Sequence, residues 1–134
     1  MGDTNDINVR NTVIQWFRQT GRDLPWRKIE DPYRILISEV MLQQTQVDRV
    51  VPAYNRFIQQ FPDFQSLARA TMADVIRAWR GLGYNRRPVY LHRTARMVMR
   101  CHGARLPNDI GMLRKLPGVG EYTASAIACF AYRA

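Results

Sequence analysis

Apolar residues recur at helical spacing along most of this chain, and no stretch alternates like a β-strand bounded by hairpin turns. Glycine and proline turn signals separate the apolar stripes at short intervals. The pattern predicts an all-α fold of six to eight short helices joined by tight loops. The predicted helices cover residues 7–20, 33–44, 47–61 (with Pro52 near its first turn), 63–70, 72–80, 86–101 and 121–133.

The predicted helix over 86–101 has two distinct faces. Basic side chains fall within a narrow arc on one side, and small or apolar side chains fall on the other. A basic ridge of this kind is either a solvated face or a surface that contacts a polyanion backbone. The ridge consists of Arg86, Arg93, Arg96 and Arg100, and the opposite face of Leu91, Thr94, Ala95 and Val98.

Charge is distributed unevenly between the two parts of the chain. The 134 residues have a formal net charge of +9. Residues 1–75 carry nine basic and nine acidic side chains, whereas residues 76–134 carry eleven basic and two acidic ones. Eighteen of the 20 basic residues are arginine, which forms forked contacts with phosphate. The charge therefore favours a polyanionic partner, with a solvated surface of high pI as the alternative.

Composition excludes several other classes of protein. No apolar run approaches the roughly 20 residues of a membrane helix, and the N-terminus lacks a basic-then-apolar signal segment. Disorder is unexpected at 46% hydrophobic residues. Two cysteines, Cys101 and Cys129, cannot form a four-cysteine metal site, so we expect reduced thiols in a cytosolic protein. The length fits one compact domain or a piece of a larger one.

Glu39 is the only ionisable residue between Ile35 and Val47, in a helix that is apolar almost all round. Burial without a partner would disfavour its charged form and raise its pKa, which suits a general acid near neutral pH. Gln43 lies one turn further on the same face, and Gln44 lies beside it. The alternative is a structural carboxylate that caps a neighbouring helix.

Two loops could contact nucleic acid. Residues 116–120, LPGVG, directly precede a predicted helix, so backbone amides and the positive end of the helix dipole could hold a phosphate oxygen. Arg114 and Lys115 favour this interpretation over a plain interhelical turn. Residues 79–87, WRGLGYNRR, could present Tyr84 to a base stack with Arg86 and Arg87 beside phosphates. Alternatively, Tyr84 packs inward in an ordinary loop.

Three segments together resemble the helix-hairpin-helix DNA glycosylase superfamily, and specifically its adenine DNA glycosylases for A/G mismatches (MutY type). The segments are LPWRKIEDPYRILISEVMLQQTQV at 24–47, GLGYNRRPVYLH at 81–92 and LPGVGEYTASAIA at 116–128. The resemblance implies a base excision repair enzyme that hydrolyses the N-glycosidic bond of adenine opposite 8-oxoguanine or guanine. It also implies a six-helix domain over 29–134, with the helix-hairpin-helix at about 108–133. Residues 1–28 would be an N-terminal helix and linker from a second, iron–sulfur domain that is otherwise missing.

The resemblance assigns a role to individual residues. Glu39 matches the acid that protonates N7 of a flipped adenine, and Tyr122 matches a pocket residue beside it. Gln44 matches a glutamine that wedges into the DNA, and Tyr84 an aromatic that inserts next to 8-oxoguanine. The remaining matches are contacts to the base pocket or to DNA. They are Trp26 and Arg27 in the pocket segment, Gln43 beside the wedge, Arg86 and Arg87, and Leu116, Gly118, Val119 and Gly120 in the hairpin.

The sequence departs from the family pattern in four ways. The family's catalytic aspartate and the four cysteines of its [4Fe–4S] cluster lie beyond Ala134. We therefore expect this chain to bind no cofactor, to bind DNA weakly and to have little or no activity alone. Position 122 is Tyr where the endonuclease III relatives carry a Schiff-base lysine, so a β-lyase step is not expected. Pro88 replaces a more usual alanine and is tolerable in a first helical turn.

The expected partner is double-stranded DNA with an A:8-oxoguanine or A:G mismatch, bound by a monomer with no membrane contact. The expected location is the bacterial cytoplasm, or the nucleus or mitochondrion in a eukaryote. Two other functions fit the sequence. One is a thymine or uracil mismatch glycosylase that shares the hairpin, and the other is a non-catalytic helix-hairpin-helix DNA-binding module.

Overall fold

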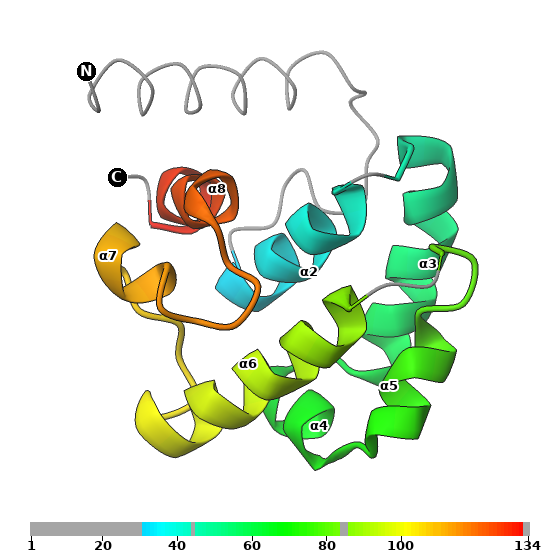
Figure 1. The fold of residues 1–134 in the computed structure, drawn as a ribbon, viewed down its shortest axis with the longest axis horizontal. Helices are drawn as coiled ribbons and strands as arrows, with labels where there is room; N and C mark the ends of the chain where they lie inside the picture. The colour runs from blue at the N-terminus through cyan, green and yellow to red at the C-terminus, as the bar shows by residue number, and fades with distance from the viewer. Residues whose placement is uncertain (1–30, 44, 84–85, 133–134) are drawn as a thin grey trace.

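The computed structural model describes residues 31–43, 45–83 and 86–132, and these residues form helices and no strand (Figure 1). The all-α prediction is therefore confirmed. The predicted helix over 7–20 and the whole domain segment 1–28 lie outside the described residues. The helices are α2 (Pro32–Leu42), α3 (Val47–Gln60), α4 (Phe64–Arg69), α5 (Met72–Ala78), α6 (Arg87–Cys101), α7 (Ile110–Leu113) and α8 (Glu121–Ala131).

Helix α2 is the central element, and it lies between α8 and α3 (Figure 1). Its start follows from local chemistry, because the Asp31 side chain accepts the backbone N–H of Tyr33 at 3.0 Å and Pro32 occupies the first turn. All its residues from Ile35 to Met41 are buried. The helix that carries Glu39 is therefore enclosed by its neighbours on nearly every side.

Helix α3 begins at Val47, as the sequence predicts. Pro52 lies inside the helix, five residues after its first residue Val47, and therefore just past the first turn. A proline there leaves the carbonyl four residues earlier, at Asp48, without its helical partner. Asp48 is exposed, so water can hydrate that carbonyl. The buried face of α3 is unaffected and still packs against α2 and α5.

Helix α6 has the two faces that the sequence predicts. Its apolar face packs against α4 and α5, with Leu91, Thr94, Ala95 and Val98 buried. The arginines of the ridge are exposed at positions 86, 93, 96 and 100. Pro88 lies in the first turn and is buried, as expected for a residue that needs no N–H partner there.

The connection between α7 and α8 is held against α6. Thr94 Oγ1 donates a hydrogen bond to the carbonyl of Pro117 at 2.9 Å, and Leu116 and Val119 are buried beneath the loop. Gly118 adopts a φ of +75°, and a Cβ added there would lie 2.7 Å from Tyr90 Cβ. Only glycine fits both the backbone conformation and the space at this position.

The hairpin glycines can be compared directly by substitution. Gly118→Ala should destabilise the chain by about 1–3 kcal/mol, because it combines a left-handed backbone with a steric clash. Gly120→Ala should change the free energy of unfolding little, since Gly120 has a φ of −88° and no atom within 4 Å of an added Cβ. Urea unfolding of both variants measures the difference, and equal stabilities would contradict the packing described for Tyr90.

Candidate active site

Glu39 is the buried carboxyl that the sequence singles out. It is 3% exposed, and among the described residues its Oε1 atom has no hydrogen-bond partner. Burial raises the pKa of Glu39 to about 8 because a low-polarity surrounding disfavours the charged form. The carboxyl is therefore mostly protonated at neutral pH. Within the described residues, Glu39 does not cap a neighbouring helix. Its carboxyl is instead a buried group that can donate a proton.

A cavity of about 150 Å³ opens beside this carboxyl. Glu39 and Leu42 line it from α2, Gln43 from the end of that helix and Tyr122 from the first turn of α8. The Gln43 side-chain amide donates to Thr123 Oγ1 at 2.9 Å, which joins the two walls. Tyr122 is 37% exposed, so the cavity wall reaches the molecular surface. The site thus holds a carboxyl with a raised pKa, an amide and a phenol around one opening.

The Tyr122 phenol remains neutral in this setting. Burial, and then the nearby Glu39 charge, raise the pKa of Tyr122 to about 12. A phenol that is neutral at physiological pH can pack against or hydrogen-bond a base but cannot act as an anion. Glu39 is consequently the group in this cavity that can exchange a proton near neutral pH.

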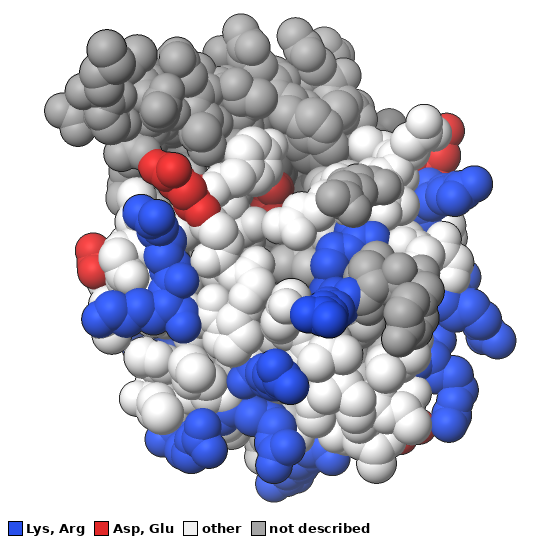
Figure 2. Space-filling model, viewed as in Figure 1, with Lys and Arg blue, Asp and Glu red and all other residues white. Residues whose placement is uncertain are grey.

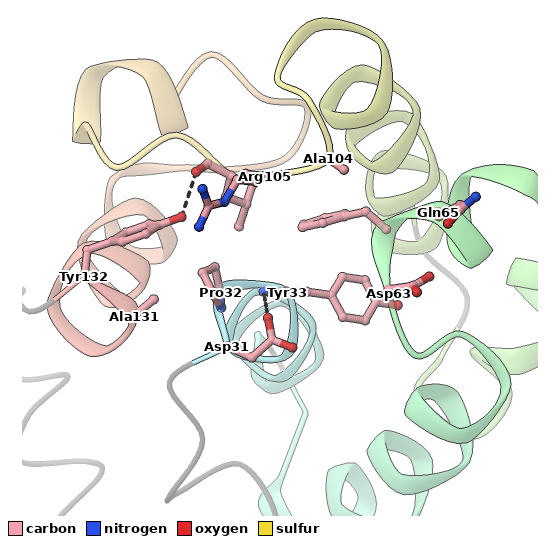
Figure 3. Close-up of a pocket in the computed structure, with 11 residues that line it drawn as sticks. Asp31, Pro32, Tyr33, Asp63, Gln65, Ala104, Arg105, Ala131 and Tyr132 are labelled. Atoms are coloured by element: carbon pink, nitrogen blue, oxygen red, sulfur yellow. Dashed lines mark hydrogen bonds between the residues drawn. The ribbon is translucent and has the colours of Figure 1, made fainter.

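A larger cavity of about 390 Å³ lies elsewhere, where the start of α2 meets the end of α8 (Figure 3). Several of its polar groups already have structural partners. Asp31 caps α2, and Tyr132 donates to the Leu106 carbonyl at 2.7 Å. Asp63 caps α4 through the backbone N–H of Ser66, and that hydrogen bond lowers the pKa of Asp63. Size alone therefore does not identify the active site, and the smaller cavity has the reactive chemistry.

The hairpin presents a second candidate surface. Gly118 and Gly120 are exposed, as are Arg114 and Lys115 just before them. Gly120 precedes α8 without a side-chain cap, which leaves the N-terminal amides of that helix available to an anion. Figure 2 shows Lys and Arg side chains over α6 and α7, and further ones at the edge of this face formed by α3 and α5. This arrangement is compatible with the predicted phosphate contact.

The structure places the other predicted residues unevenly. It brings Glu39, Gln43 and Tyr122 together around one cavity, and it exposes Arg86. Arg87 turns inward to backbone carbonyls rather than outward as the predicted DNA contact requires. Two residues that the sequence did not single out, Thr123 and Tyr90, support the cavity and the hairpin. Trp26, Arg27, Gln44 and Tyr84 lie outside the described residues.

Residues 37–127 match the model of the HhH-GPD superfamily base excision DNA repair proteins. The chain belongs to this family. It is 47% identical over 122 residues to an adenine DNA glycosylase of Mycobacterium tuberculosis, covering 90% of this chain and 40% of that relative. The chain thus spans about two fifths of the length of this curated relative.

Solved structures of the HhH-GPD family share the architecture of this chain. A thermostable thymine-DNA glycosylase superposes with a TM-score of 0.80 at 29% identity, over 98% of this chain and 61% of that one. A non-covalent endonuclease III–DNA complex superposes with a TM-score of 0.75 at 20% identity, over 97% and 60%. The second likeness supports the fold alone.

The residues present do not fit the iron–sulfur cluster that the family resemblance implies. The described residues contain no group of three or more His, Cys, Asp or Glu side chains close enough to share a metal ion. The whole sequence has two cysteines, both free thiols, whereas such a cluster takes four thiolates. Within the same part of the chain, no helix is long and apolar enough to cross a membrane.

The burial of Glu39 predicts a pH-dependent cost to folding. The pKa of Glu39 is higher in the folded chain than in the unfolded one. Its contribution to the free energy of unfolding is therefore fully present below about pH 4.5 and is lost as pH rises through about 8. The loss is roughly 1 kcal/mol per pH unit within that window. Glu39→Gln, which cannot ionise, should therefore unfold at a higher temperature than the parent at pH 8.

Thermal unfolding of both proteins at pH 5 and pH 8 measures this effect. The stability advantage of the Glu39→Gln variant over the parent should be larger at pH 8 than at pH 5. A difference that does not change with pH would mean that Glu39 is solvated or paired. Asp48→Asn, at an exposed carboxylate on α3, is the control and should show no such trend.

Proposed function

We propose that the protein carrying this chain is an adenine DNA glycosylase that hydrolyses the N-glycosidic bond of adenine opposite 8-oxoguanine or guanine. The observation that carries the proposal is the buried Glu39 carboxyl, whose pKa burial raises to about 8, in a cavity beside Tyr122. The family membership and the likeness to a curated adenine DNA glycosylase support the same activity.

The geometry suggests how the chain contributes to this reaction. A base inside a duplex must be extruded before its glycosidic bond can be reached. Cleavage of the N9–C1′ bond leaves negative charge on the adenine and an oxocarbenium-like sugar. Proton transfer from Glu39 to N7 neutralises the departing base, and the resulting carboxylate can then accept a proton from the attacking water.

The sugar cation requires a further anionic group. Glu39 is the only carboxylate among the described residues that line this cavity, and once ionised it has to serve the water. We therefore expect the 134-residue chain alone to release adenine slowly or not at all. The second carboxylate would come from another part of the whole protein.

A second candidate is a glycosylase that removes thymine or uracil opposite guanine. The superposition on a thymine-DNA glycosylase favours it. This second candidate ranks lower because the chain is 47% identical to the adenine DNA glycosylase but 29% identical to the thymine-DNA glycosylase. A non-catalytic DNA-binding module would use the exposed ridge and hairpin but would give no reason for a protonated carboxyl in a cavity.

Base release separates these possibilities. The gene product that carries this chain should release adenine from duplexes with A:8-oxoguanine or A:G, and release thymine or uracil from mismatches far more slowly. Glu39→Gln should lower the single-turnover rate by about 100-fold or more, because it removes the general acid, and leave duplex affinity within about threefold. Faster release of thymine or uracil would support the second candidate. No release of any base, with unchanged DNA affinity in Glu39→Gln, would support the binding module.

DNA affinity should depend on salt through the basic ridge. Arg93→Gln combined with Arg96→Gln should weaken duplex binding and make the slope of log K against log salt less negative, by about one unit for each phosphate that the variant no longer neutralises. Arg56→Gln, at an exposed arginine on α3 outside the ridge, is the matched control. Fluorescence anisotropy at a series of salt concentrations measures both, and equal slopes in the parent and both variants would remove the ridge from the interface.

A further inference from the structure

Arg87 reaches from the first position of α6 to the last turn of α2. Its Nη1 atom donates to the carbonyls of Val40 at 2.9 Å and Met41 at 3.0 Å, and also to the carbonyl of Gln43. Helix α2 has no basic residue of its own in that last turn. Arg87 therefore supplies both the donors and the positive charge that the C-terminus of a helix favours.

The same guanidinium holds two loops against the helix end. Its Nη2 atom donates to Thr45 Oγ1 at 3.0 Å and to the Leu82 carbonyl at 2.9 Å. Its central carbon lies 5.4 Å from the centre of the buried Trp79 ring, within cation–π range. One side chain thus connects the segment after α2, the loop before α6 and the hydrophobic core.

These contacts adjoin the catalytic cavity. Val40, whose carbonyl Arg87 binds, is the next residue after Glu39. Gln43, bound by the same atom, lines the cavity and donates through its side chain to Thr123 on α8. Any shift of the α2 terminus would move Gln43 and the wall that faces Tyr122. The contacts of Arg87 to this site are hydrogen bonds to backbone carbonyls of α2, so they bear on the position of the helix end.

We infer that Arg87 is a positioning residue for base release, and that its guanidinium fixes the end of α2, and with it Gln43, against α8. This inference rests on the proposed glycosylase function. The positioning role replaces the phosphate contact predicted for Arg87 from the sequence. The two roles affect different measurable quantities. A phosphate contact acts on DNA affinity, whereas a positioning contact acts on the rate at saturating DNA.

Arg87→Lys is the most informative variant, because it keeps the positive charge but cannot reach all the acceptors that the forked guanidinium holds in two directions. In the gene product that carries this chain, the single-turnover rate of adenine release at saturating DNA should fall about 10- to 100-fold, the range for a misplaced catalytic group. The duplex dissociation constant should stay within about threefold, and its salt slope should not change.

The matched control is Arg77→Lys on α5. The Arg77 side chain is exposed and pairs with Asp74 at 3.2 Å, so its replacement should leave rate, affinity and unfolding temperature unchanged. Weaker DNA affinity in Arg87→Lys, with an unchanged rate at saturation, would overturn the inference in favour of a phosphate contact. An unchanged rate and affinity would overturn it as well.

A double-mutant cycle tests whether Arg87 acts through Gln43. If it does, Arg87→Lys should lower the rate much less in a Gln43→Leu background than in the parent. Fully additive effects would overturn the proposed route. Should Arg87→Lys fail to fold, Thr45→Val removes a single acceptor and should give a smaller decrease in the same direction.

A readout without activity separates this inference from the proposed function. Amide hydrogen exchange of Gln43 and Thr45 in the 134-residue chain should become about tenfold faster or more in Arg87→Lys, while amides in the middle of α3 stay protected. Unchanged exchange at both sites would overturn the clamp itself. If the parent protein releases no adenine but the exchange changes as expected, the proposed function fails and the clamp stands.

Discussion

A carboxyl group enclosed by apolar helices must be either neutral or paired, and the arrangement around α2 depends on this constraint. Glu39 is enclosed because every residue of α2 from Ile35 to Met41 is buried. Its neutrality at physiological pH follows from that enclosure, since burial is what raises its pKa. The packing that stabilises the core is thus also what makes the carboxyl a proton donor.

Helix α6 connects this site to the hairpin. Arg87, Tyr90 and Thr94 follow one another at spacings of three and four residues, so they lie on neighbouring turns of one helix face. Arg87 binds the end of α2, Tyr90 packs against Gly118, and Thr94 bonds to the Pro117 carbonyl. Helix α6 thus contacts both the end of the helix that carries Glu39 and the hairpin, in addition to the direct packing of α2 against α8.

Periodicity and turn signals predicted six of the seven described helices, because burial of an apolar stripe is a local property of the sequence, and they missed the four-residue α7. Glu39 could also be found from local sequence, because it is the only ionisable residue in an apolar helical stretch. Helix α3 also begins where the apolar stripe predicts, and Pro52 is tolerated there because the carbonyl that it leaves unpaired belongs to the exposed Asp48. The roles of Arg87 and Tyr90 depend on contacts with residues far away in the sequence, Val40 and Gly118. No local pattern carries that information.

Arg86 and Arg87 illustrate how charge in a sequence divides between two physical uses. Adjacent positions on a helix point about 100° apart, so one arginine at the start of α6 faces solvent while the next reaches the end of α2. The exposed one remains hydrated and can exchange its counterions for phosphates. The inward one loses water, which lowers its pKa, and carbonyl dipoles take the place of that hydration. A count of basic residues therefore overstates the charge exposed on the surface, because Arg87 bonds to backbone carbonyls at the end of α2.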